Sequence, residues 1–219
     1  MIFVNFKTYK EGSGEKALSL VKAIEEISSQ NNVKVIPCVQ AIDLKTISTS
    51  SKLEVWIQNI DPVEYGAHTG SILPEEVLEA GAEGTLLNHS EHKVQNFEDL
   101  KMMVARANEL GLKTLIFASN LDELSKVCDL APTFASYEPG ELIGSTTTSV
   151  ATAQPDIIAK AVEITRAKGI PLIVGAGIHS SEDVRKSREL GAVGVAVATD
   201  IVKAQDPKKE LLDLIEGFK

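Results

Sequence analysis

Short runs of apolar residues alternate along this chain with segments of helical spacing. The runs are rich in Val, Ile and Leu, which is typical of strands buried on both faces of a parallel sheet. They predict strands at residues 2–6, 33–37, 55–59, 84–87, 113–117, 133–135, 171–174 and 193–197. Apolar residues spaced three and four apart predict helices at residues 14–28, 42–47, from 74 onward, 97–110, 120–130, 155–167, 181–190 and 207–218.

Residues at the helix ends support these predicted boundaries. Pro74 suits the first position of a helix, Asn120 is a typical N-cap, and Gly111 and Gly169 follow predicted C-termini. Strand and helix alternate eight times with no change of composition that would mark a second domain. The pattern predicts an α/β fold, a (β/α)₈ barrel formed as one domain by residues 1–219. An open doubly wound sheet is the alternative, which the lack of a GxGxxG motif after the first strand disfavours.

Composition narrows the classes of partner. The chain has 219 residues, a net charge of −9 and a pI of about 5.0, which argues against nucleic-acid or anionic-membrane binding. No apolar run approaches the length of a membrane span, and the N-terminal run is too short for a signal peptide. Cys38 and Cys128 have no CxxC partner and are interpreted as reduced, buried thiols of a cytoplasmic protein.

Candidate catalytic side chains follow the first, fourth and sixth predicted strands. In a barrel the carboxyl ends of the strands form the functional face, so Lys7, His89 and Glu138 should lie close together. Glu138 precedes a Pro-Gly pair, and packing does not explain a carboxylate there. A Ser-, Thr- and Ala-rich segment at 145–153 follows, which suggests a mobile flap beside a fixed acid or base.

The histidines and Glu91 near these strand ends differ in the roles that the sequence suggests. His89 begins a helix, so its pKa should be lowered, and a neutral imidazole could hydrogen-bond a developing enediolate. Glu91 could be a second catalytic carboxylate, but an ion pair that orients Lys7 is slightly favoured. The remaining histidines are interpreted as surface residues, and no metal site is predicted: His68, His92 and His179.

Small residues follow the seventh and eighth predicted strands. Gly175-Ala176-Gly177 and Ala198-Thr199 could be ordinary turns, and glycines alone are a weak signal. Together, at the last two strand ends of a barrel, they resemble loops that hold a phosphate through backbone N–H groups.

Taken in order, the motifs of the chain resemble those of the triosephosphate isomerase family. The matching segments are residues 5–7, 66–70, 88–91, 137–144, 175–178 and 196–198, and they span nearly the whole chain. The short helical segments are similar to those of the compact archaeal branch. The resemblance implies an intramolecular isomerase of glycolysis and gluconeogenesis that interconverts dihydroxyacetone phosphate and D-glyceraldehyde 3-phosphate without a cofactor.

The resemblance also implies roles for single residues. Glu138 would be the base, His89 the neutral electrophile, and Lys7 a positive charge that Asn5 helps to place. The phosphate would be held by Ile143, Gly144, Gly175, Gly177, Ala198 and Thr199. The loop at residues 66–70 would reach into a neighbouring subunit, which implies a homo-oligomer, either a dimer or a tetramer.

Three features depart from the family pattern. The flap lacks the Trp that is common in bacterial and eukaryotic members near Gly140-Glu141-Leu142. The far end of the flap reads Ile143-Gly144-Ser145-Thr146 rather than Ile-Gly-Thr-Gly, and Asp200 follows the last strand where a small residue is common. An acid beside a phosphate would repel it, so Asp200 is predicted to point away. Two other functions stay open at this stage. One is another sugar-phosphate isomerase or epimerase, and the other is a barrel that binds a phosphorylated ligand without catalysis.

Overall fold

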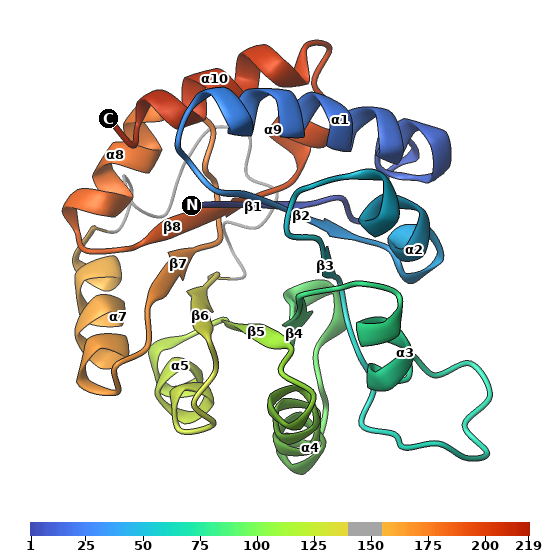
Figure 1. Cartoon of the computed structure of the whole chain (residues 1–219). Coiled ribbons are helices and arrows are strands. Elements are labelled where there is room, and N and C mark those ends of the chain that lie inside the picture. The colour runs from blue at the N-terminus through green and yellow to red at the C-terminus, as the bar shows by residue number, and fades with distance from the viewer. Residues whose placement is uncertain (140–154) are drawn as a thin grey trace.

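Eight parallel strands close into a barrel in the computed structural model, which describes residues 1–139 and 155–219 (Figure 1). Consecutive strands pair, and β1 pairs with β8 in the register Ile2↔Val195 to complete the ring. The strands are β1 (Ile2–Asn5), β2 (Val35–Val39), β3 (Trp56–Ile57), β4 (Gly84–Leu87), β5 (Lys113–Ala118), β6 (Phe134–Tyr137), β7 (Leu172–Val174) and β8 (Gly194–Val197). The predicted (β/α)₈ fold is confirmed.

Helices surround the strands on the outside of the barrel (Figure 1). They are α1 (Gly14–Gln30), α2 (Ala41–Ser50), α3 (Pro74–Glu79), α4 (Phe97–Glu109), α5 (Leu121–Cys128), α7 (Pro155–Ala167), α8 (Ser181–Glu189), α9 (Thr199–Val202) and α10 (Pro207–Glu216), with 3₁₀ turns η1 (Lys10–Gly12) and η2 (Ser90–His92). The sequence did not predict α9 or η1, because segments of three or four residues are too short to carry a hydrophobic period. Of η2 it predicted only the helix start at His89.

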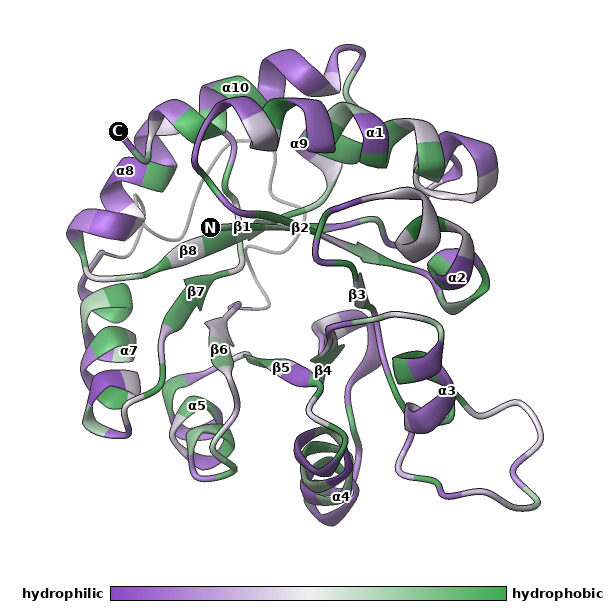
Figure 2. Cartoon of the chain, viewed as in Figure 1, coloured by the Kyte–Doolittle hydropathy of each residue, from purple (hydrophilic) through white to green (hydrophobic). Residues whose placement is uncertain are grey.

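Alternate residues of each strand serve two separate cores. Phe3 and Trp56 point into the barrel, where their rings meet edge to face with centroids 5.0 Å apart. Ile2 and Val4 face the other way and pack under the helices. The strands are therefore buried on both faces, and they are largely green in the hydropathy view of Figure 2.

Strand β2 differs from its predicted range of 33–37. Pro37 was expected to end the strand, but β2 continues to Val39. Its pairing with β3 begins only at Cys38↔Trp56, one residue after Pro37. The missing N–H therefore removes no ladder bond to β3, and the proline is tolerated.

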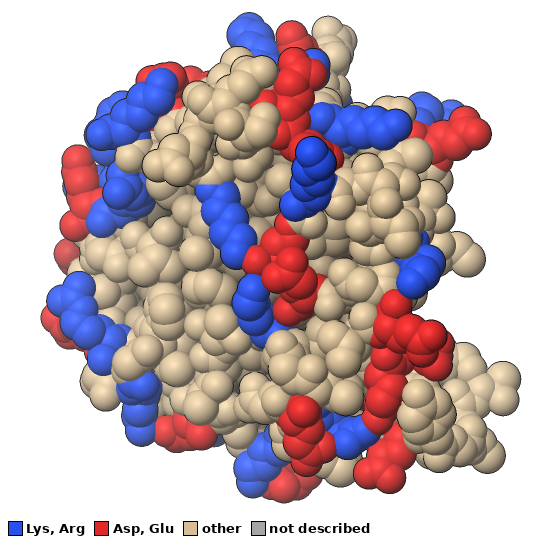
Figure 3. All heavy atoms as spheres, in the orientation of Figure 1, with Lys and Arg blue, Asp and Glu red and all other residues tan. Residues whose placement is uncertain are grey.

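Acidic and basic side chains are intermixed over the face shown in Figure 3, so the negative net charge forms no single patch there. Many are paired on the surface, such as Lys208 with Glu26 at 2.6 Å and Lys168 with Asp129 at 2.6 Å. Exposed pairs of this kind contribute little to stability, because water and salt screen them. Among the described helices, none is long and apolar enough to span a membrane.

Candidate active site

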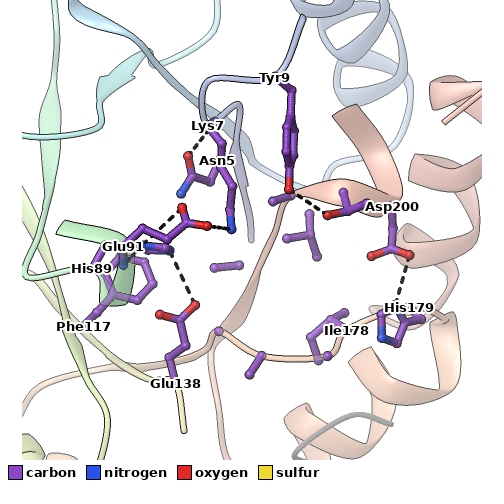
Figure 4. Close-up of a pocket in the computed structure, with 17 residues that line it drawn as sticks. Asn5, Lys7, Tyr9, His89, Glu91, Phe117, Glu138, Ile178, His179 and Asp200 are labelled. Atoms are coloured by element: carbon purple, nitrogen blue, oxygen red, sulfur yellow. Dashed lines mark hydrogen bonds and ion pairs between the residues drawn. The ribbon is translucent and has the colours of Figure 1, made fainter. Parts of the chain in front are cut away.

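A cavity of about 270 Å³ opens at the carboxyl ends of the strands (Figure 4). Its wall contains every described residue for which the sequence predicted a catalytic or binding role: Asn5, Lys7, His89, Glu138, Gly175, Gly177, Ala198 and Thr199. The two other predicted residues, Ile143 and Gly144, lie outside the described residues, as does the segment interpreted as a flap.

Glu138 follows the last residue of β6 and is almost fully buried, with 5% of its surface exposed. Its backbone N–H donates to Ala118 O at 2.8 Å, which continues the β5–β6 ladder past the strand end and fixes the start of the side chain. Burial raises the pKa of the Glu138 carboxyl to about 7, against the opposing effects of the Ser90 donors and of Lys7. Such a carboxylate is a stronger base than one in water.

One oxygen of this carboxyl group has spare hydrogen-bonding capacity. Ser90 lies near enough to lower the pKa of Glu138, yet Ser90 Oγ and Glu138 Oε2 are buried without a hydrogen-bond partner among the described residues. Glu138 Oε1 faces His89 Nε2 at 3.6 Å (Figure 4). A buried, incompletely paired carboxylate at a cavity wall is suited to accept a proton from a bound ligand.

His89 presents a defined tautomer to the cavity. Its Nδ1 accepts a hydrogen bond from the Glu91 backbone N–H at 3.2 Å, so the proton of the neutral ring lies on Nε2. Burial, and then the charge of Lys7, lower the pKa of His89 to about 4. The predicted neutral state agrees with this direction, but the main cause is burial rather than the position at a helix start. The ring rests edge-on against Phe117, with centroids 4.9 Å apart.

Lys7 is held from both sides in a strained backbone conformation. Its φ is 46°, a region that side chains rarely adopt. The Asn5 side chain accepts from its N–H at 3.0 Å, and the Gln58 side chain donates to its carbonyl at 3.0 Å. Lys7 Nζ pairs with Glu91 Oε1 at 2.8 Å, which confirms the predicted ion pair. The two hydrogen bonds and the ion pair therefore hold a cation at the cavity wall despite the strained backbone.

A buried polar network, absent from the sequence analysis, supports the turn that carries His89. Asn88 has a φ of 58°, and its side chain donates to Glu123 Oε1 and to Phe117 O, each at 2.8 Å. Glu123 also accepts from Lys93 at 2.6 Å and from Ser119. These donors lower the pKa of Glu123 to about 2 despite its burial. The network joins the β4 turn to β5 and α5.

The loops after β7 and β8 form the opposite wall. Gly175 has no room for a side chain, because a Cβ there would lie 2.6 Å from Ser136 Oγ. Gly177 has a φ of 64°, which favours glycine. Tyr9 reaches across from the β1 loop, and its hydroxyl lies 3.1 Å from Thr199 Oγ1. Tyr9 was not predicted to line the cavity, since it lies outside the predicted strand ends.

The structure corrects one interpretation and answers one prediction in this wall. His179 is not a surface residue, because it lines the cavity with 23% of its side chain exposed. Its Nδ1 lies 3.0 Å from Asp200 Oδ1. Figure 4 shows the Asp200 carboxylate turned toward this ring. Asp200 was predicted to point away from the bound phosphate; its carboxylate leans onto His179 in the β7 loop and remains in the cavity wall.

A buried base, a neutral imidazole N–H and a cation thus surround one small cavity, while the wall opposite offers small residues and a hydroxyl. This arrangement suits proton transfer next to a carbonyl group whose developing negative oxygen the imidazole and the cation can stabilise. Within the described part of the chain, no group of three or more potential ligands could hold a metal ion.

Known proteins of one family are similar to this chain over nearly its whole length. The family model "Triosephosphate isomerase" matches residues 1–218. Triosephosphate isomerase of Methanothermus fervidus is 40% identical over 217 residues, which covers 98% of this chain and 97% of that protein. The enzyme of Saccharolobus solfataricus is 41% identical over 216 residues, with 98% and 94% covered, and that of Archaeoglobus fulgidus is 37% identical over 217 residues, with 98% and 96% covered. With a barrel of this topology and a cavity of this composition, the chain belongs to the triosephosphate isomerase family.

Proposed function

We propose that Glu138, His89 and Lys7 carry out the reaction after which the family is named. The protein is an intramolecular aldose–ketose isomerase that interconverts dihydroxyacetone phosphate and D-glyceraldehyde 3-phosphate. The observation that carries the assignment is the pairing of a buried Glu138, with a pKa of about 7, and a neutral His89 whose Nε2–H faces it at 3.6 Å. Glycolysis and gluconeogenesis follow from the identity of the enzyme.

The three residues divide the proton transfers and the charge stabilisation among them. Glu138 accepts the proton from the carbon next to the carbonyl and returns it to the neighbouring carbon. His89 donates a hydrogen bond from Nε2 to the carbonyl oxygen, and then moves protons between the two oxygens of the enediolate. Lys7 stabilises the negative charge that develops on these oxygens, and Asn5 holds the Lys7 backbone. No net proton is gained or lost, as an isomerisation requires.

The phosphate of the substrate is assigned to the opposite wall. Backbone N–H groups of Gly177, Ala198 and Thr199 are the candidates, because these residues line the cavity on the side of the β7 and β8 loops. Gly175 was also predicted to bind the phosphate, but its N–H already donates to Tyr137 O at 3.1 Å, so it provides space rather than a donor. Ile143 and Gly144 complete the proposed set by family resemblance, although they lie outside the described residues. No cofactor is assigned to the reaction.

The proposed function is tested with the purified chain and each triose phosphate in turn. We expect interconversion in both directions, measured through coupled dehydrogenases that consume the product, and no requirement for added metal or cofactor. A preparation that is folded by circular dichroism but inactive in both directions would refute it.

The pH dependence of kcat/KM should report the ionisation of Glu138. Only the carboxylate accepts a proton, so kcat/KM is expected to fall about tenfold per pH unit below about pH 7. His89, with a pKa of about 4, adds no step in this range. The measurement is a pH–rate profile corrected for ionisation of the substrate phosphate by ³¹P NMR. A corrected profile that stays flat down to pH 5 would contradict the assignment.

We also propose that the protein is a homo-oligomer, either a dimer or a tetramer. The support is a second cavity of about 510 Å³ beside the active site, lined by Lys7, Gln58 and Asn59 among others. Asn59 Oδ1 is buried there without a hydrogen-bond partner among the described residues. The segment 64–71 projects between β3 and α3 with every residue exposed, and Tyr65 is 70% exposed (Figure 1). Residues 66–70 of a partner are the proposed occupant of this cavity.

Shortening the segment 66–70 should therefore dissociate the protein and lower its activity. We expect multi-angle light scattering to report a monomer, and kcat to fall because the cavity beside Lys7 is left open. Lys168→Ser is the control, because Lys168 is exposed and remote in sequence from residues 66–70. This variant should change neither the mass nor kcat. A wild-type protein that is monomeric at micromolar concentration would exclude the oligomer.

Two wider assignments complete the proposal. Residues 1–219 are assigned to one catalytic domain. A cytoplasmic location is supported by Cys38 and Cys128, which are both buried and unpaired, as is typical of a reducing compartment.

A further inference from the structure

The hydrogen bond between His179 and Asp200 joins the two loops of the proposed phosphate wall. His179 lies five residues beyond the end of β7, and Asp200 lies in α9 just after β8. Their side chains meet with Nδ1 3.0 Å from Oδ1, and both line the same cavity as Gly177 and Thr199 (Figure 4). The pair therefore belongs to the part of the cavity where an anion would bind.

The charges of this cavity do not favour an anion. Among the described residues that line it, Lys7 is the one lysine or arginine, and it is already paired with Glu91 at 2.8 Å. The acids in the wall are Glu91, Glu138 and Asp200. Asp200 is the acid next to the residues assigned to the phosphate, so an unpaired carboxylate there would repel the substrate.

His179 is held in a position to prevent this repulsion. Its backbone N–H donates to Asp183 Oδ2 at 3.1 Å, and Asp183 forms a capping box with Ser180 at the start of α8. The His179 backbone is thereby anchored to the first turn of a regular helix. From this position Nδ1–H donates to the carboxylate, and Figure 4 shows the carboxylate turned to the ring.

We infer that His179 is a positioning residue that draws the Asp200 carboxylate onto the β7 loop and offsets its charge, so that the substrate phosphate can bind between the β7 and β8 loops. The inference rests on the proposed function, since it concerns how that substrate is held. It explains how an acid is tolerated at a position beside a phosphate-binding loop. It also gives His179 a role distinct from proton transfer, because the ring acts on Asp200 rather than on the reacting carbons.

The test compares His179→Ala, Asp200→Asn and the double variant with wild type at one pH and ionic strength. The readouts are KM, kcat and the inhibition constant of inorganic phosphate. In His179→Ala we expect KM and the phosphate inhibition constant to rise about tenfold, with kcat within about threefold of wild type, because an uncompensated charge now faces the anion. Asp200→Asn alone should bind phosphate at least as tightly as wild type.

The double variant distinguishes an effect of His179 on the charge of Asp200 from an effect on the structure of the loops. If His179 acts by offsetting Asp200, the double variant regains phosphate affinity close to wild type, and added salt narrows the defect of His179→Ala. A double variant as defective as His179→Ala overturns the inference, because His179 then acts only on loop structure. Unchanged phosphate affinity in His179→Ala also overturns it.

Failure of this inference is distinguishable from failure of the proposed function. An active wild-type enzyme with no effect of His179→Ala refutes the inference alone. If the wild type does not isomerise triose phosphates, the proposed function fails, and calorimetric titration of all four proteins with inorganic phosphate still tests the pair. Thermal melts identify a variant that fails to fold. If His179→Ala fails to fold, His179→Gln takes its place, with the same predicted rescue by Asp200→Asn.

Discussion

Glu138→Gln is expected to lower kcat by about 10²–10⁴-fold with a smaller change in KM. The amide has nearly the same shape as the carboxylate and can occupy the same buried position, but it cannot accept the proton from carbon. The phosphate wall is untouched, so ground-state binding is largely preserved. Steady-state kinetics in both directions measure the effect. A variant that keeps more than about one-third of the wild-type kcat would show that the base is another residue.

The melting temperature of Glu138→Gln shows whether this variant is folded. The pKa of Glu138 is about 7 in the folded protein, against 4.5 for an ordinary glutamate, so folding disfavours the carboxylate form. Stability is therefore highest when the group is protonated and is lost as the pH rises through about 7. Glu138→Gln removes this cost, which for a shift of this size is on the order of 3 kcal/mol. The variant should melt higher than wild type at pH 8 and at nearly the same temperature at pH 5.

Lys7→Met is expected to lower kcat/KM by about 10²–10³-fold. The only cation among the described residues of the cavity wall is lost, so the enediolate oxygens lose their positive neighbour. Glu91 is largely solvated, so the loss of its partner costs little stability. Steady-state kinetics measure the effect, and circular dichroism confirms the fold.

Two control variants test whether the effect of Lys7→Met depends on the position of the lost positive charge. Lys101→Met removes an exposed lysine on α4, where Lys101 pairs with Glu98, and should leave kcat/KM unchanged. Lys7→Arg keeps the charge but changes its geometry, and should fall between wild type and Lys7→Met. If Lys7→Met retained near-wild-type kcat/KM, the cation would have no part in the reaction.

The barrel itself was predictable because its signals are local. Each of the eight apolar runs, and each helical period between them, lies within a short stretch of consecutive residues. Asn120 caps α5 by accepting from the Glu123 N–H at 2.8 Å, as its position before the apolar period predicted. The ends of parallel strands meet at one edge, so Lys7, His89 and Glu138 could be brought together from strand order alone.

Features that depend on distant contacts were not predictable in this way. Glu123 binds Asn88 across 35 residues, and Gln58 reaches the Lys7 carbonyl across 51 residues. Polar side chains of these types are usually solvated, so nothing in the sequence marked them as buried supports. His179 was misread for the same reason, because its hydrogen-bond partner Asp200 belongs to the following β/α unit.

The position of Glu138 as the base is the central claim, and hydrogen exchange with solvent tests it most directly. Wild-type protein is incubated in D₂O with dihydroxyacetone phosphate, and ¹H NMR follows the carbon-bound hydrogens. We predict that deuterium enters the carbon from which Glu138 removes the proton, with isomerised product formed alongside, and that Glu138→Gln slows both processes by the same large factor. Isomerisation that persists in Glu138→Gln, or a wild-type protein that neither exchanges nor isomerises the substrate, would contradict this account.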